Sequence, residues 1–240
     1  MGTVVAAGKR GVSTTAACTR QLHVIVIGLP GSGKSTMIRS LLDRRPQTGH
    51  FGVRLHFKRQ VELGTDIGLR AAHYVQNGLW IPDELLIEAI RAEFESGRFV
   101  HGFVIEGVPG NARQAALLDE LLDERRIDSP VLVYVEASDE LCLERALRRR
   151  VCTTCDGGVE PAVVDPDDET RCARCGSTLG RRWDDDEEPF RRRLALHRNV
   201  IGDILPYYDS ARTLVADGSR SREELLRTVV ERLAHPGCGT

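Results

Sequence analysis

One segment of nine residues constrains this chain more than any other part of its sequence. Residues 28–36 read Gly-Leu-Pro-Gly-Ser-Gly-Lys-Ser-Thr and match the pattern G-x-x-x-x-G-K-[ST]. The segment directly follows an apolar, β-branched run at 22–27 and opens a helical pattern over 34–45 that Pro46 ends. Between a strand and a helix, such glycines let backbone N–H groups converge on phosphate oxygens. The motif therefore predicts a phosphate-binding loop in a parallel α/β fold.

The residue types of this loop indicate its chemistry. The Lys34 ammonium can reach the β- and γ-phosphates of a nucleotide, and the Ser35 hydroxyl can ligate Mg²⁺. A glycine-rich turn without function is the alternative, but the chain has only three lysines, so a chance match to the pattern is rare. The residues expected to bind ATP in this loop are Pro30, Gly31, Ser32, Gly33, Lys34, Ser35 and Thr36.

Strand-like and helical patterns alternate along the rest of the chain. This alternation predicts a parallel sheet that helices cover on both faces. Further strand-like runs lie at 103–105, 131–135 and 213–215, and helical patterns at 83–94, 112–125, 138–149, 187–203 and 221–234.

Length and charge exclude several classes of protein. The 240 residues can bury a sizeable core, and a net charge of −2 excludes a general electrostatic grip on nucleic acid or anionic membrane. No apolar run approaches the roughly 20 residues that span a bilayer. Residues 1–20 lack the apolar centre of a secretory signal and are expected to be a disordered leader.

Four of the seven cysteines form two C-x-x-C pairs in a segment, 151–183, that shows little helical or strand periodicity. The pairs are separated by 16 residues, a spacing within the range of zinc ribbons. Two disulfides, a redox pair or vestigial cysteines are the alternatives. Four thiolates leave no open coordination position, so the predicted zinc is structural, and it stabilises a segment with almost no core. Such cysteine usage favours a reducing, cytoplasmic location. The predicted metal ligands are Cys152, Cys155, Cys172 and Cys175.

Four later segments accompany the phosphate-binding loop in a fixed order. They read G-L-R-A-A-H-Y-V-Q-N-G at 68–78 with I-P-D-E-L at 81–85, G-F-V-I-E-G-V-P at 102–109 with Gln114-Ala115, R-A-L-R-R-R-V at 145–151, and R-W-D-D at 182–185 with Arg193-Leu194. With the loop and the cysteine insertion, this series resembles the adenylate kinase family of nucleoside monophosphate kinases over about residues 22–235.

The resemblance implies a fold and a reaction. The fold is a doubly wound, five-stranded parallel sheet with helices on both faces and a zinc-binding lid. Its domain would span 21–235, with a core of 21–50, 79–150 and 184–235, a monophosphate-binding arm of about 51–78 and a lid of about 151–183, followed by a tail at 236–240. The reaction is ATP-dependent phosphoryl transfer to a nucleoside monophosphate, with AMP as the leading acceptor and Mg²⁺ as cofactor. A cytoplasmic monomer without nucleic-acid or membrane partners is expected.

The resemblance also implies roles for individual residues. Arg145 would lie near the adenine of ATP, and Arg149 would also bind ATP. Lys34, Arg149, Arg182 and Arg193 would be catalytic, Asp184 and Asp185 would orient the arginines, and Glu106 would hold Mg²⁺-bound water. Phosphoryl transfer needs positioning and cationic stabilisation of spread charge, which guanidinium groups supply in a bidentate manner. In an arginine-rich chain, the alternative is that any one of them only solvates a surface.

The monophosphate side departs from the family at three positions. Val53 stands where the family has Thr, and Lys58 and Gly110 stand where it has phosphate-binding Arg. Each lost charged hydrogen bond weakens binding by about 1.5–3 kcal/mol. Arg54, Arg59 or Arg113 lies near enough in sequence to replace one of them, and Gln114, which reads the adenine edge in the family, is present. The candidates for binding the monophosphate are Arg54, Lys58, Arg113 and Gln114. The alternatives are a kinase with a non-AMP acceptor and a catalytically weak, ATP-binding regulatory protein, with a zinc-ribbon nucleic-acid binder more distant.

Overall fold

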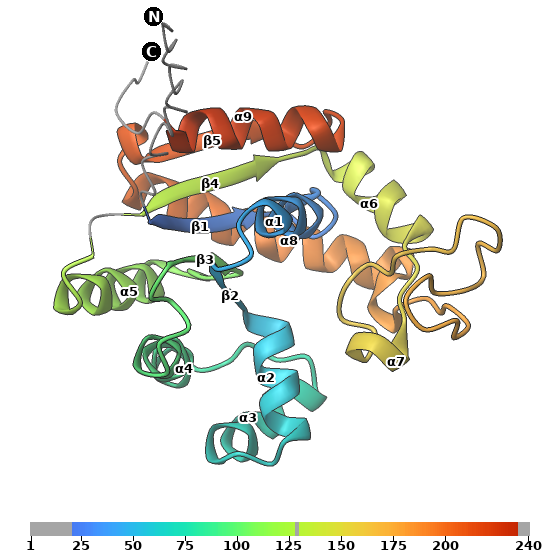
Figure 1. The fold of residues 1–240 in the computed structure, drawn as a ribbon, viewed down its shortest axis with the longest axis horizontal. Helices are drawn as coiled ribbons and strands as arrows, with labels where there is room; N and C mark the ends of the chain where they lie inside the picture. The colour runs from blue at the N-terminus through green and yellow to red at the C-terminus, as the bar shows by residue number, and fades with distance from the viewer. Residues whose placement is uncertain (1–20, 128–129, 235–240) are drawn as a thin grey trace, which may run out of the picture.

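A five-stranded parallel sheet with the strand order β2-β3-β1-β4-β5 forms the centre of the molecule (Figure 1). The computed structural model describes residues 21–127 and 130–234, so the predicted leader 1–20 and the tail 236–240 lie outside the described residues. The doubly wound fold expected from the sequence is confirmed. The strands are β1 (Leu22–Gly28), β2 (Gly49–Gly52), β3 (Gly102–Glu106), β4 (Val131–Glu136) and β5 (Thr213–Asp217).

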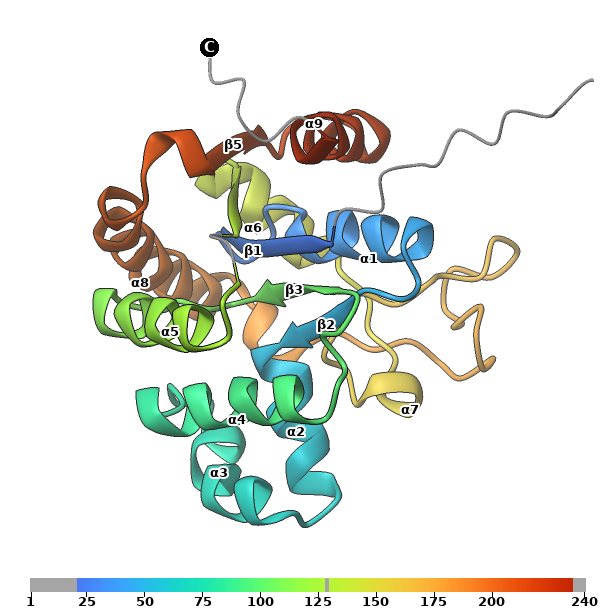
Figure 2. The same cartoon turned by 60° about the vertical axis from the view of Figure 1, so that its left-hand side comes forward.

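Both faces of the inner strands β1, β3 and β4 are buried, which explains why these strands read as continuous apolar runs. Ile25 and Phe103 belong to the core cluster formed with α4 (Asp83–Glu95), α5 (Ala112–Glu124) and α8 (Glu187–Ile204). On the opposite face, strand residues such as Val24 and Val133 pack with α1 (Lys34–Arg44) and α9 (Arg222–Ala234). Figure 2 shows α1 and α9 on one side of the sheet and α5 and α8 on the other.

The topology places the carboxyl end of β1 at the middle of the sheet. β1 pairs with β3 on one side and with β4 on the other, because the chain adds β2 and β3 on one side of β1 and then crosses to add β4 and β5 on the other. A crevice for ligands forms outside the carboxyl ends of the strands where the strand order reverses. In this register Val26 lies opposite Glu106, which brings the end of β3 beside the glycine-rich loop that follows β1.

A helical hairpin extends from the β2 edge of the sheet and forms the arm. Its helices, α2 (Val53–Glu62) and α3 (Asp66–Gln76), pack closely because Gly68 lies against the backbone of Gln60, where a side chain would collide. The Thr65 side chain accepts a hydrogen bond from the Gly68 N–H and so caps α3. The sequence patterns did not identify these two helices or the four-residue strand β2.

The lid leaves the core at the end of α6 (Asp139–Arg148) and returns at a short 3₁₀ turn, η1 (Trp183–Asp185). Apart from the one-turn helix α7 (Thr153–Asp156), isolated antiparallel bridges connect its segments. Its buried cluster contains only Cys152, Cys172 and Leu179. Two further turns, η2 (Leu205–Tyr207) and η3 (Ser210–Arg212), connect α8 to β5. Within the described ranges, every helix is too short or too polar to cross a membrane.

Candidate active site

A cavity of about 1570 Å³ lies between the glycine-rich loop, the arm and the lid. It exceeds the roughly 300–1,000 Å³ of a typical site for one small molecule, so it has room for two nucleotides. The lid and the arm both contribute to its walls, and they also touch each other: Lys58 on α2 donates a hydrogen bond to the Gly157 carbonyl in the lid. Arg39 on α1 contacts the lid as well, 3.2 Å from Glu160. The lid is therefore closed over the cavity.

The glycine-rich loop has the backbone geometry that its sequence predicts. Gly31 and Gly33 have φ of 86° and 103°, a region that other residues rarely adopt. A Cβ at Gly31 would also lie 2.5 Å from the Cys142 carbonyl oxygen. Arg145 on α6 donates to the carbonyls of Ser32, at 3.2 Å, and Gly218, at 2.8 Å. The guanidinium group is thus fixed against the loop, and Arg145 is one of the residues that line the cavity.

The Lys34 ammonium lies inside the site and is available to an anion. Its Nζ donates to the Leu29 carbonyl at 3.2 Å, which leaves donor positions for phosphate oxygens. Burial lowers the pKa of Lys34, and the charges of Arg149 and Arg193 lower it further, while Glu106 opposes them. A bound phosphate would reverse this effect, so the site favours an anion next to the ammonium.

Glu106 and Ser35 form a polar pair beside Lys34. The Ser35 hydroxyl donates to Glu106 Oε1 at 2.6 Å, and His50 Nε2 lies 3.7 Å from Glu106 Oε2. Burial opposes ionisation of Glu106, but His50, Lys34 and Ser35 together keep its pKa below the usual range. A carboxylate and a hydroxyl are hard oxygen donors, which fit Mg²⁺ or its bound water. The two residues named for Mg²⁺ from the sequence therefore lie together.

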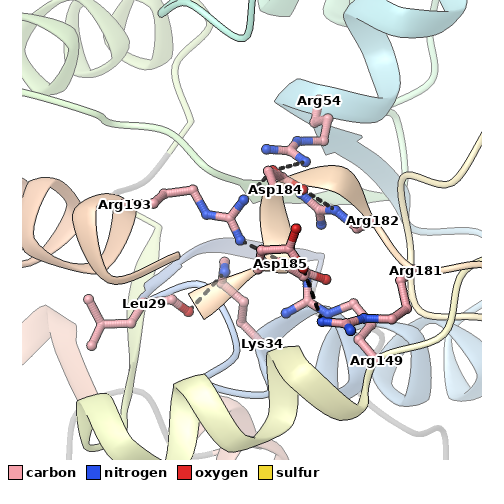
Figure 3. Close-up of polar contacts among 10 residues, drawn as sticks. Leu29, Lys34, Arg54, Arg149, Arg181, Arg182, Asp184, Asp185 and Arg193 are labelled. Atoms are coloured by element: carbon pink, nitrogen blue, oxygen red, sulfur yellow. Dashed lines mark hydrogen bonds and ion pairs between the residues drawn. The ribbon is translucent and has the colours of Figure 1, made fainter. Parts of the chain in front are cut away.

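Three guanidinium groups converge on the carboxylate of Asp184 (Figure 3). Arg182 binds both oxygens, with Nε 2.9 Å from Oδ1 and Nη2 2.7 Å from Oδ2. Arg193 from α8 also donates to Oδ2, and Arg54 from α2 lies 3.3 Å from the same atom. Asp184 therefore connects the arm, whose Arg54 is 130 positions away in the sequence, to the lid exit and to α8.

Asp185 binds Arg149 and shares Arg193 with Asp184. Its Oδ1 lies 3.2 Å from Arg193 Nη2 and 3.5 Å from Arg149 Nη1, and the side chain is 1% exposed. The Arg193 Nε is buried and has no hydrogen-bond partner among the described residues. The cations of this cluster outnumber its carboxylates, so it has positive charge left over for the transferred phosphate. The five cations are Lys34, Arg54, Arg149, Arg182 and Arg193, and the three carboxylates are Glu106, Asp184 and Asp185.

The four predicted cysteine ligands come together in the lid. Cys152 Sγ lies 3.5 Å from Cys175 Sγ, and Cys155 Sγ lies 3.7 Å from Cys172 Sγ. All four sulfur atoms are within 4.8 Å of one another. A tetrahedral zinc ion with Zn–S bonds of about 2.3 Å needs sulfurs roughly 3.8 Å apart. The residues present therefore fit a structural zinc ion, whose chemistry would be to crosslink the two knuckles of the lid.

The residues named for the monophosphate side occupy different environments. Arg54 and Lys58 line the cavity, but Arg113 does not, and it pairs with Glu84 on the surface. Gln114 lines the cavity yet is only 2% exposed, because Gly110 and Asp83 bind its amide. Among the candidates to replace the two missing arginines, Arg54 joins the arginine cluster through its contact with Asp184.

Two aromatic residues of the cavity escaped the sequence analysis. His197 on α8 follows Arg193 by one helical turn, so the i, i+4 spacing could have indicated that both face the site. Its ring packs against Trp80, with centroids 5.5 Å apart. Burial lowers the pKa of His197 to about 4, and the charges of Lys34 and Arg193 contribute. At neutral pH the imidazole is therefore uncharged.

This neutral imidazole makes stability depend on pH. Because the pKa of His197 is about 4 in the folded chain and about 6.5 when unfolded, the unfolded chain binds the extra proton between these values. The free energy of unfolding should fall as the pH falls through this window, by at most about 3 kcal/mol from this group. We expect His197→Gln to flatten the dependence in urea unfolding. The exposed His101, changed to Gln, is the control, and an unchanged slope in His197→Gln would contradict the assignment.

A cavity with these cations supports transfer of a phosphoryl group, and the fold that carries it is that of the P-loop phosphotransferases. The sequence profile described as adenylate kinase matches residues 26–213. Adenylate kinases from Clostridium perfringens and Clostridium tetani are 28% and 29% identical to this chain, over 88% and 87% of it and 98% and 96% of their own lengths. One from Symbiobacterium thermophilum is 33% identical over 78% of this chain and 86% of its own. The chain belongs to the adenylate kinase family and is a nucleoside monophosphate kinase, and its cysteine cluster is consistent with the zinc-lid type.

Proposed function

We propose that this protein transfers the γ-phosphoryl group of ATP to AMP and forms two molecules of ADP. The observation that carries the proposal is the closed arginine cluster: Arg149, Arg182 and Arg193 are held by two buried aspartates opposite Lys34. Such an arrangement places fixed positive charge around the position of a phosphoryl group before the reaction begins. Preorganised charge of this kind is usually the largest contribution to catalysis.

The residues of the chain would act by position and charge. An oxygen of the acceptor phosphate attacks the γ-phosphorus of ATP, and the bond from that phosphorus to the β–γ bridging oxygen breaks, so that ADP leaves. Lys34 and Arg193 would stabilise the oxygens of the transferred group, and Arg149 and Arg182 would hold it between donor and acceptor. Ser35 and Glu106 would hold Mg²⁺ and its water, and the ion supplies neutralisation of the β- and γ-phosphate charge.

The closed lid also supports transfer to a nucleotide over hydrolysis. The contacts of Arg39 with Glu160 and of Lys58 with Gly157 join the lid to α1 and to the arm. A cavity closed on both sides limits the access of water, which would otherwise compete with the acceptor for the γ-phosphoryl group.

Arg54 is the residue that we propose as the clamp of the acceptor phosphate. Its guanidinium group lies 3.3 Å from Asp184 Oδ2, beside Arg182 and Arg193, and reaches the site from the arm. We expect Arg54→Ala to raise the KM for AMP by about 10- to 100-fold, since one charged hydrogen-bonding group is lost, with little change in the KM for ATP. Arg59→Ala, on the same helix but outside the cavity lining, is the control. Equal KM values for AMP in the two variants would contradict the role of Arg54.

A panel of acceptors tests the function as a whole. The purified protein is supplied with ATP, Mg²⁺ and each nucleoside monophosphate in turn, and formation of ADP is followed. We expect rapid ADP formation with AMP. Turnover with other monophosphates but not with AMP would instead favour a non-AMP acceptor, which Val53 and Gly110 at the acceptor side make the second candidate. ATP binding without transfer to any acceptor would favour a regulatory protein.

A further inference from the structure

We propose that the indole of Trp80 is the surface on which the base of the acceptor nucleotide stacks, and that the acceptors are purine nucleoside monophosphates chosen by stacking. This inference rests on the function proposed above, because it assigns the base of the acceptor to the same cavity. Trp80 lies in the segment between α3 and α4, lines the cavity and is 50% exposed. A half-exposed indole inside a ligand cavity offers a large, rigid apolar face.

Two neighbours hold the indole in place. On one side its ring packs against His197, with an interplanar angle of 42°. Its benzo ring also occupies the space beside Gly110, where a Cβ would lie 2.6 Å from Trp80 Cζ3 and 3.3 Å from Cε3. Any larger residue at 110 would displace the indole. The glycine at position 110, where the family has an arginine, therefore leaves the space that the indole of Trp80 occupies.

The acceptor must reach the transferred phosphate from the side opposite the glycine-rich loop. Arg54 and Arg193 mark the place of its phosphate, so its nucleoside extends toward the arm. There the wall of the cavity becomes apolar, and Val53, Tyr74 and Val75 line it together with Trp80. An apolar wall with one broad aromatic face fits a flat heterocyclic base better than it fits a second charged group.

The side chain that could have read the edge of the base is already engaged. Gln114 Oε1 accepts a hydrogen bond from the Gly110 N–H at 2.6 Å, and its Nε2 donates to Asp83 Oδ1 at 2.8 Å. With 2% exposure, this amide holds the loop after β3 to α4. Stacking does not depend on the pattern of donors and acceptors at a base edge, because every base has a π-face. The cavity should therefore favour two-ring bases over one-ring bases and distinguish adenine from guanine only weakly.

Tryptophan fluorescence tests the contact directly. The chain has two tryptophans, so Trp183→Phe leaves Trp80 as the sole one. Titration of that variant with AMP should quench the emission to saturation, and GMP should do the same at a concentration within about tenfold. CMP should quench more weakly, because its base has a smaller face.

Kinetics then separate a binding surface from a structural side chain. We expect Trp80→Leu to raise the KM for both AMP and GMP by about tenfold, as for the loss of one base–aromatic stack, and to leave the KM for ATP within about twofold. Trp80→Phe should restore part of the loss. Leu69→Ala, at an exposed position of α3 outside the cavity lining, is the control. Because the quenching experiment keeps the indole, the inference can be tested even if Trp80→Leu fails to fold.

Three results would overturn the inference while leaving the proposed function in place. They are a Trp80 emission that does not respond to AMP, a KM for AMP in Trp80→Leu within about twofold of the wild type, and a preference for AMP over GMP beyond about 100-fold, which would assign selection to hydrogen bonds at the base edge. Failure of the wild-type protein to transfer phosphate to any monophosphate, with saturable quenching by AMP retained, would instead refute the function and keep the binding surface.

Discussion

Lys34→Ala is expected to reduce phosphoryl transfer by on the order of 10³-fold or more, the largest effect of any single substitution considered for the donor side. The ammonium lies inside the site at the start of α1, and its one hydrogen bond within the described part of the chain goes to the Leu29 carbonyl of the glycine-rich loop that would hold the phosphates. Alanine removes this charge where no other side chain of the loop can supply one. The measurement is kcat for ADP formation from ATP and AMP.

The control for this substitution is Arg44→Ala, which removes a cation at the exposed end of the same helix. It should keep the activity of the wild type. The melting temperature of Lys34→Ala should stay close to that of the wild type, because burial of the ammonium costs free energy that alanine avoids. A Lys34→Ala variant that retains full activity would refute the mechanism, since the other cations would then be sufficient.

Cys152→Ser should release the zinc ion and destabilise the lid. The lid has a buried cluster of only three residues, so the free energy of metal binding takes the place of a hydrophobic core. A loss of about 3 kcal/mol would lower the melting temperature by about 6–12 °C in a chain of this size. Activity should fall as well, because Arg182 and Asp184 lie at the point where the lid rejoins the core. Zinc content by atomic absorption and thermal unfolding are the measurements.

Cys142→Ala is the matched control, because Cys142 is buried in α6 outside the cluster of four sulfurs. This variant should keep one zinc ion per chain even if it is less stable. Chelation of the metal from the wild type should reproduce the effect of Cys152→Ser. If Cys152→Ser retained the same zinc content and the same melting temperature, the cluster would not be a zinc site.

Local patterns predicted the parts of this molecule that local chemistry determines. The glycine-rich loop is specified by adjacent residues, and the cysteine ligands by two short spacings, so both could be found without the fold. Strands β1, β3 and β4 were visible because burial on both faces makes them continuously apolar, and the edge strand β5 was visible from its Thr-Leu-Val run although Val215 is 54% exposed. Strand β2 was not, since it contains two glycines in four residues. Helices α2 and α3 pack mainly on each other, and their buried residues are only Phe57, Gly68 and Ala71, so few large apolar residues mark them in the sequence.

The acceptor side could not be derived from the sequence for a different reason. Arg54, Arg59 and Arg113 all lie within four positions of the missing arginines along the chain. Only the fold shows that Arg54 contacts Asp184, from which it is separated by 130 positions. The contact between Trp80 and Gly110 also depends on tertiary structure, because these residues are 30 positions apart in the sequence. The indole fills the space that a side chain at position 110 would need. Residue types indicate what a side chain can do, but contacts of this kind depend on topology.

Asp184 and Asp185 have a consequence for turnover. In the closed lid these carboxylates bind the guanidinium groups, so the protein itself supplies each of these cations with an anionic partner. An arriving phosphate competes with these carboxylates for the guanidinium groups, and the carboxylates bind them again when ADP leaves. The pair thereby reduces the difference in free energy between the empty and the occupied enzyme. Exchange of substrate for product can then proceed because neither the empty nor the occupied enzyme is much lower in free energy than the other, although the affinity for nucleotide is reduced.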